Sequence, residues 1–119
     1  ELDFITQYRL KHLIKDFSLL SSDEATFVNQ SRTSVDFLIF NKVTKVPVLA
    51  IEVDGVKYHN NPDQMKRDSM KNNIFKNYQL PLLRLATNGS GEEEKIRFAL
   101  ADYKSTDEII QSKDMINNI

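Results

Sequence analysis

The sequence predicts an α/β fold in which helices pack against a mixed β-sheet, and three observations favour this fold class. Residues 34–40 (SVDFLIF) and 46–54 (VPVLAIEVD) are rich in β-branched and aromatic side chains, which is typical of paired strands. Asn61 and Pro62 then form a favourable helix start. The apolar run at residues 80–86 indicates a strand buried on both faces, which a right-handed crossover would place beside and parallel to strand 46–54.

The remaining elements follow from the same patterns. We expect a first strand over residues 4–10 that runs into a short turn, and a loop or irregular connection over the polar residues 21–32. The helix that begins at Asn61-Pro62 should extend to residue 78, and a last helix should cover residues 92–103. The predicted order is therefore strand, strand, strand, helix, strand, helix.

Length and composition restrict the class of protein. The chain has 119 residues and a mass of 13.8 kDa, which suits a single domain over residues 1–119. Cysteine is absent, which excludes disulfides, zinc-thiolate sites and thiol catalysis and suits a cytoplasmic protein. The longest apolar run, residues 46–51, is far too short to span a membrane. Because the chain starts at Glu1, we expect a piece of a larger protein, with residues 104–119 as a peripheral tail.

Carboxylates interrupt the apolar pattern of both central strands. Side chains alternate across a strand, so Glu52 and Asp54 share one face of the second strand with small apolar residues. On the preceding strand, Asp36 stands between Val35 and Phe37. If the two strands pair in an even register, Asp36 lies opposite Glu52 or nearly so, and three carboxylates converge.

Converging carboxylates on apolar strands indicate a metal site. Each buried acid loses hydration and repels its neighbours, and a divalent cation removes this repulsion. Oxygen ligands alone select a hard cation such as Mg²⁺ or Mn²⁺. The alternative is that Asp36, Glu52 and Asp54 lie on an exposed sheet face and are simply solvated. The coincidence of all three acids favours the metal site.

A histidine and a helical acid are further candidates. His59 follows Gly55 by four residues, in a loop that must return toward the strand ends, so it could transfer a proton; the alternative is a structural histidine. At 100° per residue, Asp68 falls in one helical stripe with Met65 and Phe75, which we expect to be buried anchors. Asp68 should then face the sheet and reach toward His59, unless it only bonds the backbone.

The charge distribution points to an anionic ligand. Between Lys42 and Arg84 there are eight basic and four acidic residues, although the whole chain has a net charge of -1. A basic rim around an acidic centre suits a metal-dependent enzyme that acts on nucleic acid, whereas many charge runs are merely solvated faces. The candidate nucleic-acid-binding side chains, of which the three on the helix lie off its buried stripe, are Lys57, Lys66, Arg67 and Lys71.

Together these residues resemble a known nuclease superfamily. The blocks VDF (35–37) and AIEVDG (50–55), followed by His59 and a helix with Asp68, resemble the PD-(D/E)XK superfamily, and within it the branch with very-short-patch-repair-like endonucleases. Residues 77–96 resemble the small nuclease-like domains near the C-terminus of superfamily 1 helicase-type ATPases. The resemblance covers residues 33–100. It implies a restriction-endonuclease-like mixed β-sheet of about four strands flanked by helices.

The resemblance also implies roles for individual residues. Asp36 and Glu52 occupy the positions that bind Mg²⁺ in the family, and Asp54 stands where a lysine is usual. A branch with an E-x-D, His and Asp signature shares this departure, which extends site roles to Asp54, His59 and Asp68. Many relatives also carry a glutamate on a helix before the first strand, and Glu1 is a poor substitute for it.

Two functions follow from the resemblance and the site. The preferred one is a cytoplasmic Mg²⁺-dependent endonuclease domain that hydrolyses DNA and is attached to a helicase-type ATPase in the parent chain. The alternative is a catalytically weak or inactive nuclease-like module that binds DNA for the attached helicase. The missing lysine and the missing upstream glutamate favour this alternative.

Overall fold

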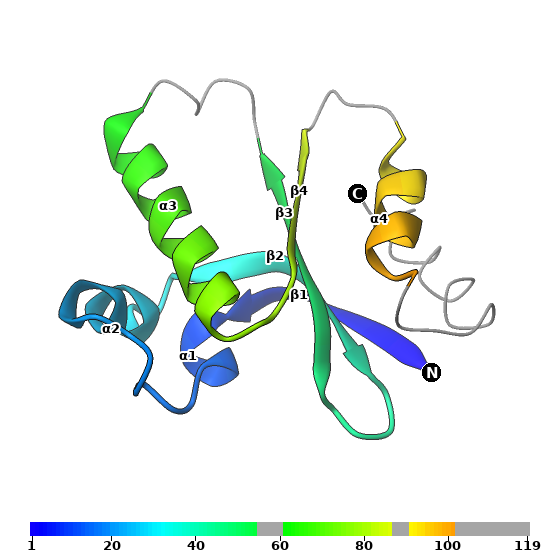
Figure 1. The fold of residues 1–119 in the computed structure, drawn as a ribbon, viewed down its shortest axis with the longest axis horizontal. Helices are drawn as coiled ribbons and strands as arrows, with labels where there is room; N and C mark the ends of the chain where they lie inside the picture. Colours follow the sequence, from blue (N-terminus) through cyan, green and yellow to red (C-terminus); the bar gives the residue numbers. More distant parts are fainter. Residues whose placement is uncertain (55–60, 87–90, 102–119) are drawn as a thin grey trace.

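One four-stranded mixed sheet organises the chain, in a computed structural model that describes residues 1–54, 61–86 and 91–101 (Figure 1). Its strands, in spatial order, are β1 (Leu2–Arg9), β2 (Ser34–Asn41), β3 (Pro47–Asp54) and β4 (Leu82–Ala86). β1 and β2 are antiparallel, as are β2 and β3, whereas β3 and β4 are parallel. The predicted α/β class and the parallel crossover after β3 are therefore confirmed.

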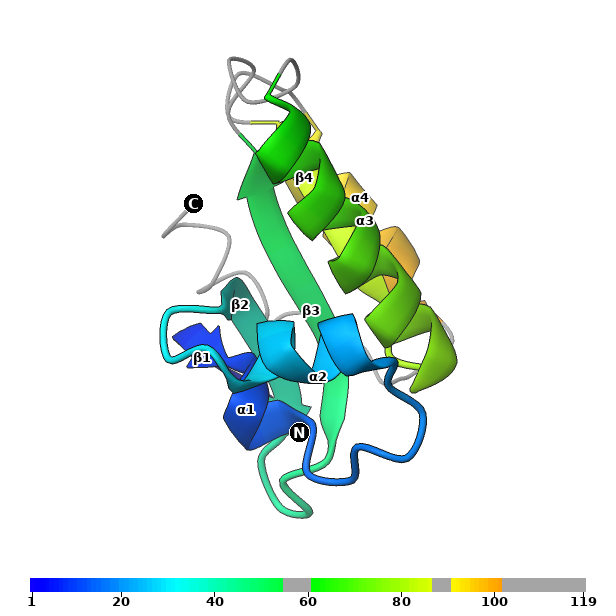
Figure 2. The ribbon, with the colours of Figure 1, turned by 90° about the vertical axis from the view of Figure 1, so that its left-hand side faces the viewer.

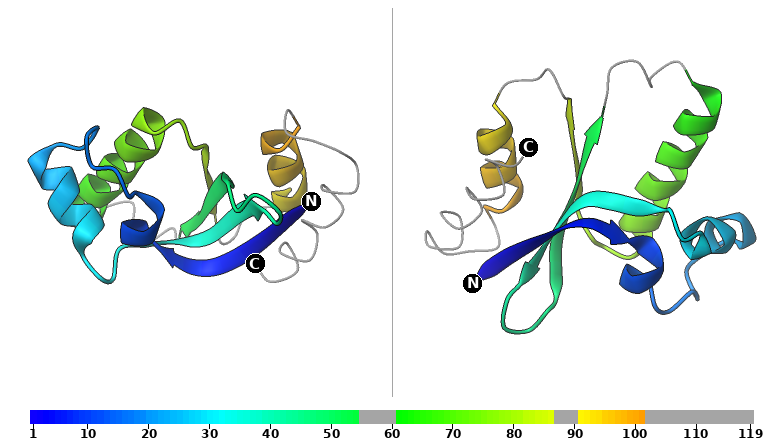
Figure 3. Two further views of the ribbon diagram at one scale, coloured as in Figure 1. Left: turned by 90° about the horizontal axis from the view of Figure 1, so that it is seen from below. Right: turned by 180° about the vertical axis from the view of Figure 1, so that it is seen from behind.

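Helices cover both faces of this sheet. They are α1 (Leu10–Leu13), α2 (Ser22–Asn29), α3 (Pro62–Asn77) and α4 (Glu92–Ala99). The first three lie on one face, which Figure 2 shows from the front, and α4 lies alone on the other face (Figures 1 and 3). None of the helices in the described part of the chain is long and apolar enough to cross a membrane.

Two apolar clusters hold the layers together. The cluster between the sheet and α4 contains Phe37, Ile39, Leu49, Ile51, Leu85, Ile96 and Leu100. The cluster under the other three helices contains Leu10, Phe27, Val28, Leu38, Ala50, Ile74 and Phe75. From Phe37 to Ile39 and from Leu49 to Ile51, successive residues thus belong to opposite clusters, as the two-residue period of a strand requires.

The start of α3 agrees with the sequence. The Asn61 side chain accepts hydrogen bonds from the backbone N–H groups of Asp63 (3.0 Å) and Gln64 (3.3 Å), with Pro62 in the first helical position. The prediction that Met65 is a buried anchor is wrong, because this residue is 56% exposed. Phe75 is buried as predicted, together with Ile74. The buried stripe therefore has a different phase from the predicted one.

The expected loop over residues 21–32 is also wrong, because most of it forms α2. Ser21 and Glu24 make a capping box, in which each side chain accepts a hydrogen bond from the backbone N–H of the other (3.2 and 2.9 Å). Phe27 and Val28 are then buried one turn later. The bond from the Ser21 backbone, with one from Asn73, lowers the pKa of Glu24, so this buried acid is a charged link between α2 and α3.

Two boundaries at the C-terminal end also differ. β4 begins at Leu82 and is an edge strand in which only Leu85 is fully buried, so it is not buried on both faces along its length. α4 starts after Gly91, whose φ of 76° lies in the left-handed region that glycine tolerates, and it ends at Ala99 rather than at residue 103. Residues 104–119 lie outside the described residues.

Candidate functional site

The candidate site lies on the sheet face that α3 covers. Phe37 pairs with Ile51 in the β2–β3 ladder, so the next residues along, Asp36 and Glu52, come opposite each other. Glu52 in turn lies beside Arg84 in the parallel β3–β4 ladder. Because neighbours in the ladder point to the same face, these three charged side chains all project toward α3.

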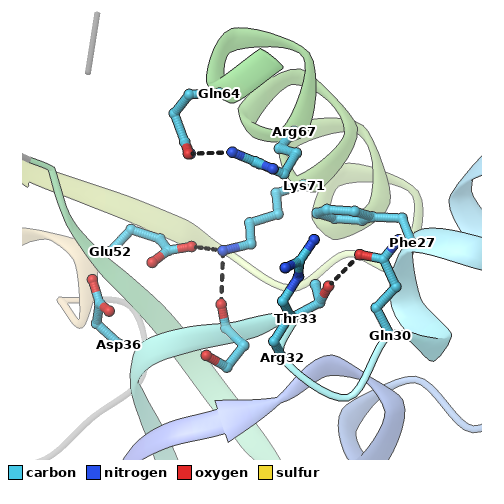
Figure 4. Close-up of a pocket in the computed structure, with 10 residues that line it drawn as sticks. Phe27, Gln30, Arg32, Thr33, Asp36, Glu52, Gln64, Arg67 and Lys71 are labelled. Atoms are coloured by element: carbon cyan, nitrogen blue, oxygen red, sulfur yellow. Dashed lines mark hydrogen bonds and ion pairs between the residues drawn. The ribbon is translucent and has the colours of Figure 1, made fainter. Parts of the chain in front are cut away.

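Asp36 and Glu52 form a carboxylate pair, and Figure 4 shows the two side chains next to each other on adjacent strands, with the Glu52 carboxylate turned toward Lys71. Asp36 is held in place because its Oδ2 accepts a hydrogen bond from the Val53 backbone N–H at 2.7 Å, while its Oδ1 accepts one from Gln7 at 3.2 Å. Glu52 is a buried residue that is only 6% exposed. Burial, opposed by Lys71 and reinforced by Asp36, raises the pKa of Glu52 from 4.5 to about 7.

Lys71 reaches this pair from α3. Its ammonium donates to a Glu52 carboxylate oxygen and to the Ser34 backbone carbonyl, the latter at 2.7 Å (Figure 4). The Lys71 side chain is only 14% exposed. Lys71 lines the pocket, as the sequence predicts for a residue that flanks the stripe, but its ammonium contacts Glu52 instead of lying open to solvent.

A pocket of about 380 Å³ opens beside the pair. Asp36, Glu52 and Lys71 line its inner side, and the arginines Arg32 and Arg67 line it from opposite walls (Figure 4). Arg67 comes from α3, as the sequence predicts, and donates to the Gln64 amide oxygen at 3.2 Å. Arg32, in the turn before β2, was not among the predicted residues. The pocket therefore combines a carboxylate pair with three cationic side chains.

Arg84 organises a second group of charges, which we call the Arg84 clamp. Its Nη1 lies 3.3 Å from both Asp54 carboxylate oxygens and 3.6 Å from Asp68 Oδ1. Its other nitrogens donate to the Asn72 side chain and to the Asp68 backbone carbonyl. Asp68 also accepts a hydrogen bond from Gln64 at 2.9 Å. Arg84 thus joins α3 to β3 and β4. The sequence predicts Asp54 at the metal and Asp68 near His59, whereas the structure places both carboxylates at Arg84.

The predicted site residues are therefore divided between two places. Asp36 and Glu52 form the pair, whereas Asp54 and Asp68 face Arg84. Across residues 1–54, 61–86 and 91–101, no group of three acidic or histidine side chains lies close enough to hold one metal ion. His59 lies outside the described residues.

The predicted nucleic-acid-binding residues also lie in different places. Lys66 is exposed on α3, and Arg67 and Lys71 line the pocket. Lys57, like His59, falls in the segment 55–60 that the structure does not describe.

One signal in the sequence could have revealed Arg84. It interrupts the apolar run of β4 just as Glu52 interrupts β3, and the observed parallel register brings the two positions side by side. A charged residue within an otherwise apolar strand needs a partner of opposite charge on the same face. Arg32 gave no comparable signal, because basic residues in turns are usually solvated.

The donor set of the pair suits a hard divalent cation. Both side chains offer carboxylate oxygens, and a cation would relieve the burial and the repulsion that raise the pKa of Glu52. The chain provides one internal cation there, Lys71, which contacts one Glu52 oxygen. The residues present therefore fit a Mg²⁺ or Mn²⁺ ion held by two carboxylates and water.

Comparison with known proteins identifies the family. The model of the family DUF2726, which is described as a protein of unknown function, matches residues 1–103. Because this match covers most of the chain, the chain belongs to that family. No curated protein and no solved structure matches the chain.

Proposed function

We propose that this member of the DUF2726 family is a nuclease that depends on Mg²⁺ or Mn²⁺ and hydrolyses phosphodiester bonds in DNA. The observation that carries the proposal is the Asp36–Glu52 pair, in which a buried carboxylate faces a second one beside a pocket with cationic walls. A like-charge pair is unfavourable by itself and becomes favourable around a cation. Cationic walls next to it attract the phosphates of a polynucleotide.

Each residue of the pocket has a role in this proposal. Asp36 and Glu52 would hold the ion through their carboxylate oxygens. When bound, the ion would lower the pKa of a water molecule and polarise the scissile phosphate. Lys71 would fix one Glu52 oxygen and donate to a nonbridging phosphate oxygen, and Arg67 would bind phosphate at the pocket wall.

The Arg84 clamp would act on the site indirectly. By binding Asp54 on β3 and Asp68 on α3, Arg84 fixes the helix that delivers Lys71 to Glu52. In this role Asp54 and Asp68 position the helix over the pair, and His59 remains a proposed proton donor or acceptor. Lys57 and Lys66 would extend the phosphate-binding surface.

The finer parts of the proposal rest on the resemblance to PD-(D/E)XK nucleases. The position of the carboxylates on adjacent strands, followed by a helical crossover to a parallel strand, supports a restriction-endonuclease-like fold. Attachment to a helicase-type ATPase and a place in the cytoplasm are proposed from the sequence resemblance and the absence of cysteine.

One observation favours a second candidate, a nuclease-like module that binds DNA without cleaving it efficiently. The carboxylates already have internal cations, Lys71 at Glu52 and Arg84 at Asp54 and Asp68. A bound ion would have to compete with Lys71 for Glu52. If Lys71 excludes the metal ion from Glu52, the pocket still binds phosphate through its cationic walls but does not catalyse hydrolysis.

A nicking assay separates these two functions. The purified protein is incubated with supercoiled plasmid and with a labelled oligonucleotide, in Mg²⁺, in Mn²⁺ and in EDTA. We expect cleavage with either metal and none in EDTA, and Asp36→Ala and Glu52→Gln should abolish it. Glu94→Gln, an exposed glutamate at the start of α4, is the matched control and should cleave normally. Normal DNA binding without any metal-dependent cleavage would favour the binding module.

A further inference from the structure

Two arginines in the pocket lack acidic partners. In the described part of the chain, the Arg32 side chain makes no ion pair or hydrogen bond, and the Arg67 side chain donates only to the Gln64 amide oxygen, at 3.2 Å. Arg84 and Arg97 differ, because each contacts a carboxylate. A guanidinium has five donors in a planar fork that matches a phosphate or carboxylate, so two neighbouring arginines without such a partner point to an anionic ligand.

The positions of Arg32 and Arg67 indicate where such an anion would bind. Arg32 and Arg67 line the inner pocket with the carboxylate pair, and they also line an adjoining outer pocket of about 300 Å³ between α2 and α3. They therefore stand where the two pockets meet. Figure 4 shows them projecting from opposite walls, Arg67 from α3 and Arg32 from the turn before β2.

Each of the two pockets adds further charges next to the arginines. Asp23 and Asp63 line the outer pocket and disfavour an anion there, although Lys66 lies nearby. On the inner side, the Lys71 ammonium adds a third positive charge, and Gln30 and Thr33 add polar groups. The inner side also has two carboxylates, Asp36 and Glu52, so formal charge alone does not distinguish the two sides. We place the anion on the inner side because the Asp36–Glu52 pair lies there, and this choice rests on the proposed function.

We propose that Arg32 and Arg67 form a phosphate subsite, which binds the phosphodiester next to the one at the Asp36–Glu52 pair. The identity of that neighbouring phosphate rests on the proposed function, whereas anion binding by the two arginines does not. Arg32 is then a nucleic-acid-binding residue carried by the turn after α2. Because the subsite binds phosphate and no base, it should bind both single-stranded and duplex DNA. The experiment below compares the two.

DNA binding in EDTA tests the subsite without any catalysis. Fluorescence anisotropy is measured with a labelled 15-mer, as a single strand and as a duplex, over a range of salt concentrations. Arg32→Ala and Arg67→Ala should each weaken binding by about three- to tenfold and reduce the salt slope by about 1, as expected for a lost phosphate contact. Arg9→Ala removes an exposed arginine of β1 and should bind like the wild type.

Inorganic phosphate provides a direct second readout. In the wild-type protein, titration with phosphate should shift the side-chain Nε–H NMR signals of Arg32 and Arg67 and leave those of Arg9 and Arg84 in place. Binding by both variants that equals the wild type, or phosphate shifts confined to other arginines, would overturn the subsite. An equal loss in Arg9→Ala would overturn it as well, because the effect would then be one of net charge.

The subsite and the proposed function can fail separately. Asp36→Ala should bind DNA in EDTA at least as tightly as the wild type, because it removes a negative charge beside the phosphates. If Asp36→Ala cleaves normally while Arg32→Ala and Arg67→Ala lose affinity, the metal site is wrong and the subsite stands. If Asp36→Ala abolishes cleavage while both arginine variants bind normally, the subsite is wrong and the nuclease stands.

Discussion

Glu52 and Asp54 are two residues apart on one strand and point to the same face, yet they lie in different electrostatic environments. The Glu52 side chain is 8% exposed and has a carboxylate and an ammonium as neighbours. The Asp54 side chain is 27% exposed, and both of its oxygens lie 3.3 Å from one guanidinium nitrogen. Burial dominates at Glu52, whereas a neighbouring cation compensates Asp54.

This difference separates the proposed metal site from a structural link. The Asp36–Glu52 pair has more negative charge than Lys71 neutralises, and a divalent cation would complete it. The Arg84 clamp joins three elements through its own ion pairs and needs no ligand. From residue types and spacing alone, Glu52 and Asp54 are equivalent candidates for a metal ligand. The partners on β4 and α3 make them different.

The largest expected effect is on cleavage. Asp36→Asn should lower the rate with Mg²⁺ at least about 100-fold, more than the loss of a residue that only supports a metal ligand usually costs. Asp54→Asn, two residues from Glu52, should retain the rate within about tenfold, because it weakens only the clamp. Single-turnover rates on the same labelled oligonucleotide give the comparison. Equal losses in the two variants would mean that Asp54 belongs to the metal site after all.

The second expected effect is on stability as a function of pH. Without metal, the folded protein holds the Glu52 proton up to its pKa of about 7, whereas the unfolded chain releases it near 4.5. The protonated Glu52 therefore contributes fully to the free energy of unfolding below pH 4.5. This contribution is lost as the pH rises from 4.5 through 7, and the loss amounts to up to about 3 kcal/mol. Glu52→Gln has no carboxylate to ionise at this position. The free energy of unfolding of this variant, relative to that of the wild type, should therefore increase between pH 4.5 and 8.

Urea unfolding at pH 5 and pH 8 in EDTA measures this change. Added Mn²⁺ should restore part of the wild-type stability at pH 8 and have no such effect on Glu52→Gln, since a ligand that binds only the folded state stabilises it. A constant difference between the two proteins across this range would show that Glu52 is not destabilised by its charge.

A smaller effect concerns the clamp. Arg84→Ala should destabilise the fold by about 1–2 kcal/mol, because Asp54 and Asp68 lose their partner and the link between α3 and the sheet is broken. The value is modest because these side chains are a quarter to a third exposed. Urea unfolding should show this loss, and Arg9→Ala should stay within about 0.5 kcal/mol of the wild type. Similar values for the two variants would show that the clamp contributes little.

Much of the framework follows from the sequence. β2 and β3 have the β-branched and aromatic composition of strands, and Asp36 lies opposite Glu52 as expected for an even register, which the sequence analysis assumed. Asn61-Pro62 marked the start of α3. These features are local, so a short stretch of sequence contains all the information that they need.

The rest depends on contacts between distant segments. α3 buries few large apolar residues, so its stripe could not be oriented from spacing. Met65 was predicted to be buried and is exposed, and Lys71 was predicted at the rim of the pocket and points inward to Glu52. The orientation of α3 is fixed by the Glu52 and Arg84 contacts across the sheet. α2 was a different error, because the capping box of Ser21 and Glu24 is visible in the sequence and was read only as polarity.

The smallest expected effect is at the exposed end of the proposed DNA-binding surface. Lys66→Ala should weaken DNA binding by about two- to threefold, because an exposed lysine in water contributes little. Lys76→Ala removes the same charge from the other end of α3 and should leave binding unchanged. Anisotropy in EDTA measures both variants. A larger loss in Lys76→Ala would move the DNA to a different face of the helix.

Titration of the wild-type protein with Mn²⁺ at pH 7.5, followed by calorimetry, tests most directly whether the Asp36–Glu52 pair is a metal site. We predict that the protein binds Mn²⁺ at one site, which Asp36→Ala and Glu52→Gln eliminate and Asp54→Asn retains. Absence of binding in the wild type, or equal binding in Asp36→Ala, would contradict the assignment of a metal to this pair.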